Sequence, residues 1–235
     1  MWHFETSFSE IITRAPGVKS FRFPISSATA PFQPGQYFFV TLKVNGEESL
    51  HHFTISSAPS DPHLEFTKRI TEHPYSLALD AAKPGEKVSI QGPMGNFLLP
   101  HEPAKIVFLT GGIGITPVRS MIGYIATKNL DFDIIIICGN QRQQDIVFHD
   151  EFELLAKGLS SVRIINVLTE PPDGWAGLTG LINKKLITDT VPDYRERIFY
   201  VSGPPKMVMA LQEQLGALKI PMNNIVRDSF TGYDD

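Results

Sequence analysis

The sequence predicts two domains of different class: an antiparallel β-barrel over residues 1–101, followed by an α/β domain with a parallel sheet over residues 102–235. Two observations support this prediction. The spacing of apolar residues changes near residue 101, and 235 residues are enough for two modest domains that each bury a core. With 42% hydrophobic and 20% charged residues, the composition is that of an ordinary globular protein.

The first half shows short apolar runs that mostly alternate with polar residues, at positions 4–8, 18–23 and 37–42. These runs are separated by the turn pairs Pro34-Gly35, Asn45-Gly46 and Pro84-Gly85, which is typical of antiparallel strands. One helical segment interrupts the pattern at residues 75–82 and stops at Pro84-Gly85. We therefore expect a small barrel with a single short helix.

The second half alternates compact apolar strands with longer amphipathic segments. Strands are predicted at residues 106–109, 134–138, 162–168, 198–201 and about 225–230. The segments 118–128, 150–159, 181–187 and 206–218 fall between them, as helices would. This alternation predicts a parallel sheet covered on both faces, with its ligand crevice at the carboxyl ends of the strands.

Charge and cysteine content exclude several classes of function. A net charge of -4 and the lack of a Lys/Arg-rich stripe argue against a nucleic-acid partner. The longest apolar runs are too short for a membrane span, and the N-terminus lacks a secretory pattern, so we expect a cytoplasmic protein. The single Cys138 excludes an internal disulfide or a four-cysteine cluster, and the histidine spacing predicts no metal site.

A glycine-rich loop, Thr110-Gly111-Gly112-Ile113-Gly114-Ile115-Thr116-Pro117, lies between a predicted strand and a predicted helix. We expect Thr116 to cap this helix and Pro117 to open it. Glycines let a ligand approach the backbone, and the positive end of a helix dipole favours a pyrophosphate. A tight structural turn is the alternative interpretation.

A second loop, Ser202-Gly203-Pro204-Pro205-Lys206-Met207, also follows a predicted strand. Because the carboxyl ends of parallel strands share one edge of the sheet, the two loops should line one cleft. A structural turn between a strand and a helix, without any binding role, is the alternative interpretation of these residues.

In the first half, His51-His52-Phe53-Thr54-Ile55-Ser56-Ser57 places an aromatic ring, a hydroxyl and small residues along one extended stretch. A flat aromatic ligand could use each of them, although alternating Phe53 and Ile55 also suit a core strand. On a strand, His51 and His52 would point to opposite faces. A fourth segment, Gly92-Pro93-Met94-Gly95-Asn96-Phe97, forms a glycine-rich turn before the domain junction.

In this order, the segments resemble the ferredoxin–NADP reductase superfamily, which includes flavin reductases, cytochrome b5 reductase and the reductase components of oxygenases. The resemblance covers nearly the whole chain. The matching segments are Gly35-Gln36-Tyr37 (a barrel strand), His51 to Thr54 (the flavin motif Arg-x-Tyr-Ser/Thr), Gly92 to Phe97 (the inter-domain turn), Gly111 to Pro117 (the nicotinamide loop), Ser202 to Met207 (Cys-Gly-Pro-Pro-x-Met) and Phe230-Thr231-Gly232-Tyr233 (the aromatic C-terminal ending).

The resemblance implies FAD, or FMN, on the barrel and NADH or NADPH on the second domain, with hydride passing to the flavin and electrons passing on to a protein acceptor. It implies catalytic roles for Thr54, at the reacting edge of the flavin, and Ser202, beside the nicotinamide. It also implies cofactor-binding roles for Thr54, His51, Phe53, Ser57, Ser76, Gly111, Gly112, Gly114, Thr116, Pro117, Gly203, Pro204, Met207, Phe230 and Tyr233.

Several residues depart from the family pattern. His51 replaces an arginine that neutralises flavin phosphate, Phe53 replaces a tyrosine, and His73, Pro74 and Tyr75 replace the glycines before Ser76. These changes weaken the FAD assignment and leave FMN or a loosely held flavin as an alternative. For the coenzyme, Asn140-Gln141 is similar to relatives that use NADH, although Arg142 could meet a 2′-phosphate.

Two other functions stay open at this point. The chain could be a flavin reductase that releases free reduced flavin, or a non-catalytic subunit that keeps the fold without turnover.

Overall fold

The structure is a computed structural model that describes residues 1–230. Its contacts divide the chain into two compact units. The first holds Met1–Leu99 together with Thr116–Thr127, and the second holds Pro100–Ile115 and the chain from Lys128 onward. The domain limits 1–101 and 102–235 stay a prediction. The helix that follows the glycine-rich loop therefore groups with the first unit.

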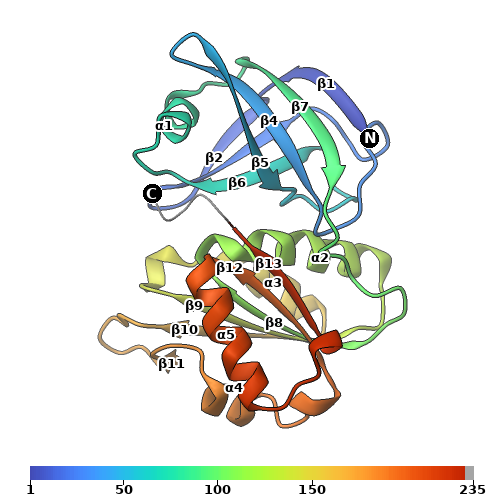
Figure 1. Cartoon of the computed structure of the whole chain (residues 1–235), viewed down its shortest axis with the longest axis vertical. Helices are drawn as coiled ribbons and strands as arrows, with labels where there is room; N and C mark the ends of the chain where they lie inside the picture. The colour runs from blue at the N-terminus through green and yellow to red at the C-terminus, as the bar shows by residue number, and fades with distance from the viewer. Residues whose placement is uncertain (231–235) are drawn as a thin grey trace. The chain divides into compact units, whose positions relative to one another are not determined.

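Besides the segment Thr116–Thr127, the first unit contains two antiparallel sheets and one short helix (Figure 1). Asn45 and Gly46 both have positive φ at the turn between two of the strands, which is why this pair closes a hairpin there. The elements are β1 (Trp2–Ser7), β7 (Lys87–Met94), β4 (Tyr37–Val44) and β5 (Glu47–Thr54) in one sheet, β2 (Glu10–Ala15), β3 (Val18–Phe23) and β6 (Leu64–Arg69) in the other, and α1 (Pro74–Ala81).

An aromatic core fills the space between these sheets. The ring of Phe66 stacks on Phe21 at 4.9 Å and on Phe53 at 4.5 Å between centroids. Strand β5 therefore turns His51 and Phe53 toward the core side. His52 points to the other face, where its ring lies 5.2 Å from that of Tyr37. The expectation that His51 and His52 point to opposite faces of the strand is confirmed.

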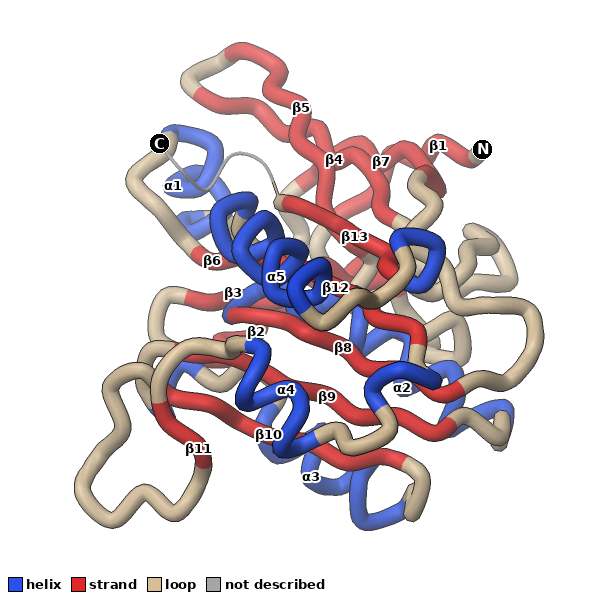
Figure 2. The backbone as a smooth tube through the Cα atoms, turned by 60° about the horizontal axis from the view of Figure 1, so that its bottom comes forward, coloured by secondary structure: helices blue, strands red, loops and turns tan. Residues whose placement is uncertain are grey.

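The second unit is built on a six-stranded parallel sheet in the order β11-β10-β9-β8-β12-β13 (Figure 2). This confirms the two-part fold class that the sequence predicts. The strands are β8 (Lys105–Gly111), β9 (Asp133–Asn140), β10 (Val162–Leu168), β11 (Leu178–Thr179), β12 (Ile198–Gly203) and β13 (Ile225–Ser229).

Helices follow the strands as the alternation predicts. Val107, Ile137 and Val201 pack with helices α4 and α5 on one face of the sheet, and α3 contributes side chains to a pocket on the other face. The helices are α2 (Ile115–Lys128), α3 (His149–Gly158), α4 (Lys184–Thr190) and α5 (Pro205–Ala217), with 3₁₀ turns at Gly112–Gly114, Gln143–Asp145, Tyr194–Glu196 and Met222–Asn224.

Two details of the expected helices are wrong. Helix α2 begins at Ile115 because the 3₁₀ turn Gly112–Gly114 runs directly into it, so Thr116 is the second helical residue and not the cap. The segment 181–187 becomes helical only at Lys184, where the side chain of Asn183 accepts a hydrogen bond from Leu186 N at 3.0 Å. Within the described residues, no helix is long and apolar enough to cross a membrane.

Candidate functional site

Five neighbouring strands carry polar side chains at one level near their carboxyl ends. Ser202 is in register with both Thr110 and Asp228, Thr110 is in register with Cys138, and Cys138 is in register with Asn166. Registered neighbours in a parallel sheet point to the same face, so the five side chains form one row. We call these residues the polar row.

The two predicted loops meet at this row. The hydroxyl of Ser202 donates a hydrogen bond to Gly114 O at 2.8 Å. A Cβ atom on Gly114 would collide with the Ser202 carbonyl oxygen, and one on Gly111 would collide with the sulfur of Met207. A Cβ on Gly203 would lie 2.6 Å from Met207 Cε. Gly114 is therefore required for the close packing of the two loops, because its neighbour is backbone, whereas Gly111 and Gly203 meet the flexible end of Met207.

Gly112 differs from these glycines. It has a φ of 52°, and a Cβ added there would meet nothing within 4 Å. The backbone of the loop is thus open to a ligand at Gly112, immediately before α2. Thr116 and Pro117 lie buried in the first turn of that helix, and Pro204 precedes α5, which starts at Pro205.

Two buried polar atoms near the row are unsatisfied. Thr110 Oγ1 and Asn140 Oδ1 are both buried without a hydrogen-bond partner among residues 1–230, while Asn140 Nδ2 contacts Cys138 Sγ at 3.3 Å. Leaving a buried polar group unpaired costs about 1–3 kcal/mol, which a bound ligand can recover. The row and the open loop at Gly112 fit a polar, phosphate-bearing ligand such as a nicotinamide dinucleotide.

Asp228 is a member of the row that the sequence analysis missed. Burial raises the pKa of its carboxyl to about 6. A carboxyl with such a pKa exchanges protons near neutral pH and can act as an acid or a base. The sequence offered one signal, an acidic residue within the last predicted strand directly before the aromatic ending.

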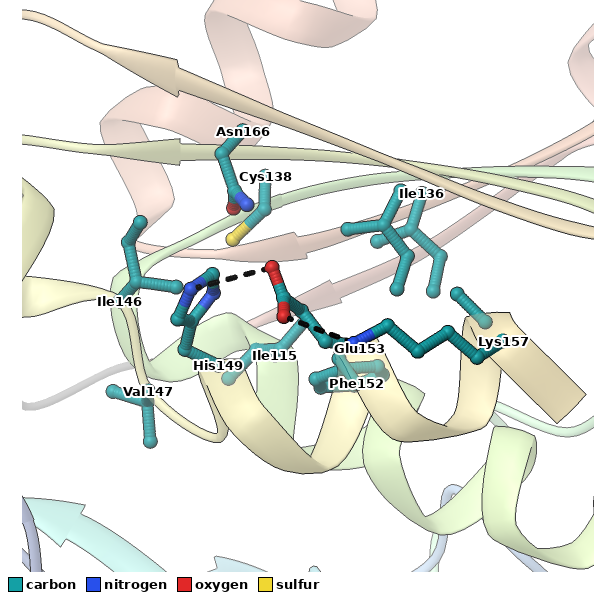
Figure 3. Close-up of a pocket in the computed structure, with 12 residues that line it drawn as sticks. Ile115, Ile136, Cys138, Ile146, Val147, His149, Phe152, Glu153, Lys157 and Asn166 are labelled. Atoms are coloured by element: carbon teal, nitrogen blue, oxygen red, sulfur yellow. Dashed lines mark ion pairs between the residues drawn. The ribbon is translucent and has the colours of Figure 1, made fainter. Parts of the chain in front are cut away.

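The far end of the row opens into a pocket of about 330 Å³ (Figure 3). Cys138 and Asn166 line it from the strands, while Phe152 and Glu153 line it from α3. Glu153 forms ion pairs with His149 at 3.6 Å and with Lys157 at 3.8 Å. Burial raises the pKa of the Cys138 thiol to about 11, so the thiol stays protonated and is a poor nucleophile.

In the first unit, the flavin-motif residues occupy the end of β5. Thr54 is half-buried and Phe53 is 8% exposed. Tyr75, which stands where the family pattern has glycine, is buried, and its hydroxyl donates to Val40 O at 2.8 Å. Its ring lies 4.1 Å from that of His51. The side chain of Tyr75 thus fills the space beside His51.

Two serines predicted to bind the flavin, Ser76 and Ser57, form hydrogen bonds within the protein. Ser76 is fully buried, and its Oγ accepts a hydrogen bond from Thr71 N at 2.8 Å. Ser57 is also fully buried and accepts from Glu65 N at 2.9 Å. Burial lowers the pKa of His51, and the charges of His73 and Lys68 lower it further. His51 is therefore neutral at pH 7.

Lys68 is the positive side chain that the sequence analysis did not single out. It lies on β6 with its ammonium 6.0 Å from the ring centroid of Phe53, and burial lowers its pKa. Binding of a flavin ring at Phe53 and Thr54 stays a prediction. This end of the barrel fits flavin phosphates poorly, because Ser76 is enclosed and His51 carries no charge at neutral pH.

The remaining predicted residues lie near the second loop or beyond the described part. Phe230 N donates to Gly203 O at 3.0 Å, which brings the C-terminal strand to that loop. Tyr233 lies outside the described residues. In the coenzyme segment, Glu170 accepts from Gln141 Nε2 at 2.6 Å and from Arg142 Nε at 2.9 Å. Arg142, the cation that could meet a 2′-phosphate, is thus already paired with Glu170.

Comparison with known proteins identifies both units. Residues 6–98 match the model of the oxidoreductase FAD-binding domain, and residues 108–213 match that of the oxidoreductase NAD-binding domain. An FAD-binding domain followed by an NAD-binding domain defines a class of flavin- and nicotinamide-dependent oxidoreductases. Within that class, the chain belongs to the family of ferredoxin–NADP reductases and cytochrome b5 reductases, as the sequence motifs predict.

Similar sequences include reductase subunits of a bacterial monooxygenase and a bacterial N-demethylase. The glycine betaine monooxygenase reductase subunit of Pseudomonas aeruginosa is 32% identical over 205 residues, which are 85% of this chain and 56% of that protein. The stachydrine N-demethylase reductase subunit of Rhizobium meliloti is 31% identical over 232 residues, or 94% of this chain and 66% of that protein. The chain thus spans little more than half the length of the first of these relatives.

Solved structures share the fold at lower identity. The cytochrome b5 reductase domain of Ulva prolifera nitrate reductase superposes with a TM-score of 0.84 at 22% identity, covering 97% of both chains. A ferredoxin NADP+ reductase from Neisseria gonorrhoeae with bound FAD and NADP gives 0.82 at 18% identity, covering 97% of this chain and 98% of that one. These likenesses confirm the two-part architecture.

Proposed function

We propose that this chain is an NAD(P)H-dependent flavin oxidoreductase, which takes hydride from a nicotinamide coenzyme onto FAD and passes the electrons to a protein acceptor. The observation that carries the proposal is the polar row at the strand ends together with the open loop at Gly112. Thr110 and Asn140, on neighbouring strands, hold unsatisfied polar atoms, and the loop leads into a helix start that suits a pyrophosphate. When bound, the flavin supplies the hydride-accepting chemistry, and the chain supplies binding, orientation and exclusion of water.

The acceptor is proposed to be a protein because the relatives described above are reductase subunits of a monooxygenase and an N-demethylase. Those proteins are longer than this chain, so the inference that this chain also has a protein acceptor rests on the shared part alone. The proposal includes a cytoplasmic location, which the single cysteine supports.

We propose NADH as the preferred coenzyme. The ion pair between Arg142 and Glu170 supports this choice, because a carboxylate already holds the guanidinium and its negative charge disfavours a 2′-phosphate nearby. The hydrogen bond from Gln141 to the same carboxylate keeps Glu170 in place.

A visible spectrum of the purified chain, followed by anaerobic addition of NADH and NADPH in separate samples, tests the proposal. FAD is supplied if none is retained. We expect NADH to bleach the flavin band faster than NADPH does. If neither coenzyme bleaches the flavin, the proposed activity is wrong and the non-catalytic subunit replaces it.

A flavin reductase that releases free reduced flavin is the second candidate function. The enclosed Ser76 and the neutral His51 favour it, because a flavin held mainly by its ring exchanges more readily than one anchored by its phosphates. Gel filtration of the flavin-loaded chain distinguishes the two functions. Retained flavin supports the electron-transfer reductase, and flavin that separates from the protein supports the flavin reductase.

A further inference from the structure

Helix α2 is attached to the end of the flavin-motif strand by two buried hydrogen bonds. Arg119 Nη1 donates to Ser56 O at 2.6 Å, and Ser120 Oγ donates to Ser57 O at 2.7 Å. Ser56 lies two residues after Thr54, and Arg119 lies two residues after Pro117. Within the first unit, these bonds join the segment expected at the flavin to the helix that starts at the coenzyme loop.

The attachment continues along the helix. A Cβ atom on Gly123 would lie only 2.9 Å from Ala58 Cβ, so the helix backbone approaches this loop as closely as a glycine allows. Further on, the hydroxyls of Thr127 and Ser60 lie 3.0 Å apart. More than two turns of α2 therefore follow residues 56–60.

The fully buried carboxylate of Glu65 lies next to this attachment and contacts both Ser56 and Arg119. Glu65 Oε2 accepts from Arg14 Nη2 at 2.9 Å and from Arg22 Nε at 2.7 Å. Its other oxygen accepts from Ser56 Oγ at 3.1 Å and lies 3.5 Å from Arg119 Nη1. Burial alone would raise the pKa of Glu65, but the charges of the three arginines outweigh it and lower the pKa, so the carboxylate is ionised at neutral pH.

The backbone of Glu65 holds the same two serines. Ser56 N donates to Glu65 O at 2.7 Å, and Glu65 N donates to Ser57 Oγ at 2.9 Å. Residues 56–57 are thus fixed from one side by Glu65 and from the other side by Arg119 and Ser120. A buried charge balanced by cations cannot relax cheaply when it is neutralised, because the arginines are then left without their partner.

We propose that Glu65 and Arg119 are positioning residues, which fix the start of α2 at Thr116 and Pro117 relative to Thr54 and thereby set the rate of hydride transfer. This inference rests on the proposed function. The side chains of Glu65 and Arg119 are engaged with the barrel, and they act through the segments that they hold. Hydride transfer depends steeply on geometry, since a displacement of about 1 Å can cost on the order of 100-fold in rate.

The first test measures flavin reduction by rapid anaerobic mixing with saturating flavin and increasing NADH. For Glu65→Gln, we expect the limiting reduction rate constant to fall about 10-fold or more, with the Kd for NADH changed by less than about twofold. Glu10→Gln is the matched control, because Glu10 also pairs with Arg22 but is 55% exposed. An unchanged limiting rate in Glu65→Gln would overturn the positioning role.

A second readout uses the flavin-free protein and does not depend on turnover. Hydrogen exchange of backbone amides should become faster in Glu65→Gln both at residues 56–58 and in the first turns of α2, and should stay unchanged in Glu10→Gln. Faster exchange confined to β6 would overturn the link between the two segments. If the wild-type chain reduces no flavin, the proposed function is wrong. The exchange result decides separately whether Glu65 links residues 56–58 to the first turns of α2.

A milder variant keeps the test informative if Glu65→Gln does not fold. Ser120→Ala deletes one hydroxyl that donates to Ser57 O and leaves the buried charges intact. We expect a smaller fall in the limiting rate, about two- to fivefold, and faster exchange at the same two segments. No change in either measurement would overturn the proposal.

Discussion

Ser202 and Asp228 lie side by side at the carboxyl ends of β12 and β13, in register across a parallel ladder. Burial raises the pKa of Asp228 to about 6. We expect a carbon-detected NMR titration of the Asp228 carboxyl to give a midpoint near pH 6 instead of the ordinary value near 4. A midpoint at the ordinary value would contradict the burial of this side chain.

The same shift predicts how stability depends on pH. Because the folded-state pKa is raised, the folded chain binds more protons than the unfolded chain between about pH 4 and pH 6, and the free energy of unfolding falls as the pH rises through this window. The loss should be on the order of 2 kcal/mol and should be complete above the folded pKa. Urea unfolding of the wild type and of Asp228→Asn measures it, and parallel pH profiles for the two proteins would refute the assignment.

Glu170 offers a test of coenzyme preference. Glu170→Gln removes the charge that holds Arg142 and leaves a side chain of similar size. We expect the affinity for 2′,5′-ADP to rise about three- to tenfold, because the guanidinium of Arg142 is released and the repulsion of the phosphate by Glu170 is lost. Calorimetry with 2′,5′-ADP and with 5′-AMP gives the comparison. The effect should become smaller when Arg142→Gln is added, because only the loss of repulsion then remains.

Lys68 is expected to supply the positive charge that His51 lacks. Lys68→Met should weaken binding of FMN about 10-fold while changing the affinity for riboflavin much less, because only FMN carries a phosphate. Fluorescence titration of both flavins measures this difference. Lys43→Met, at an exposed position of β4, serves as the control. Equal losses for FMN and riboflavin would mean that Lys68 acts through packing.

Substitution by alanine should lower the free energy of unfolding by different amounts at two glycines of the same loop. Gly114→Ala forces a Cβ into the Ser202 carbonyl, and we expect it to lower the free energy of unfolding by about 3 kcal/mol or more. Gly112→Ala meets no neighbour but strains a positive φ, at a cost of about 1 kcal/mol. Gly112→Ala should also weaken NADH binding. Equal stability losses would contradict the distinct roles of the two glycines.

The motifs and the alternation of strands and helices predict the architecture well, because both are local patterns. The close packing of the Gly111 and Ser202 loops also follows from two strand ends that share one edge of the sheet. By contrast, the place of Tyr75 against His51 depends on how α1 meets β5, which spacing along the chain does not express. The role of Glu65 is set by arginines from three distant elements, so a reading of neighbouring residues could not find it.

The most direct test of the central claim is an anaerobic titration of the FAD-loaded chain with NADH, followed by the flavin absorption band. The proposed function predicts complete bleaching at one NADH per flavin, since each hydride carries two electrons and a flavin accepts two. A flavin band that persists in excess NADH and in excess NADPH would contradict it.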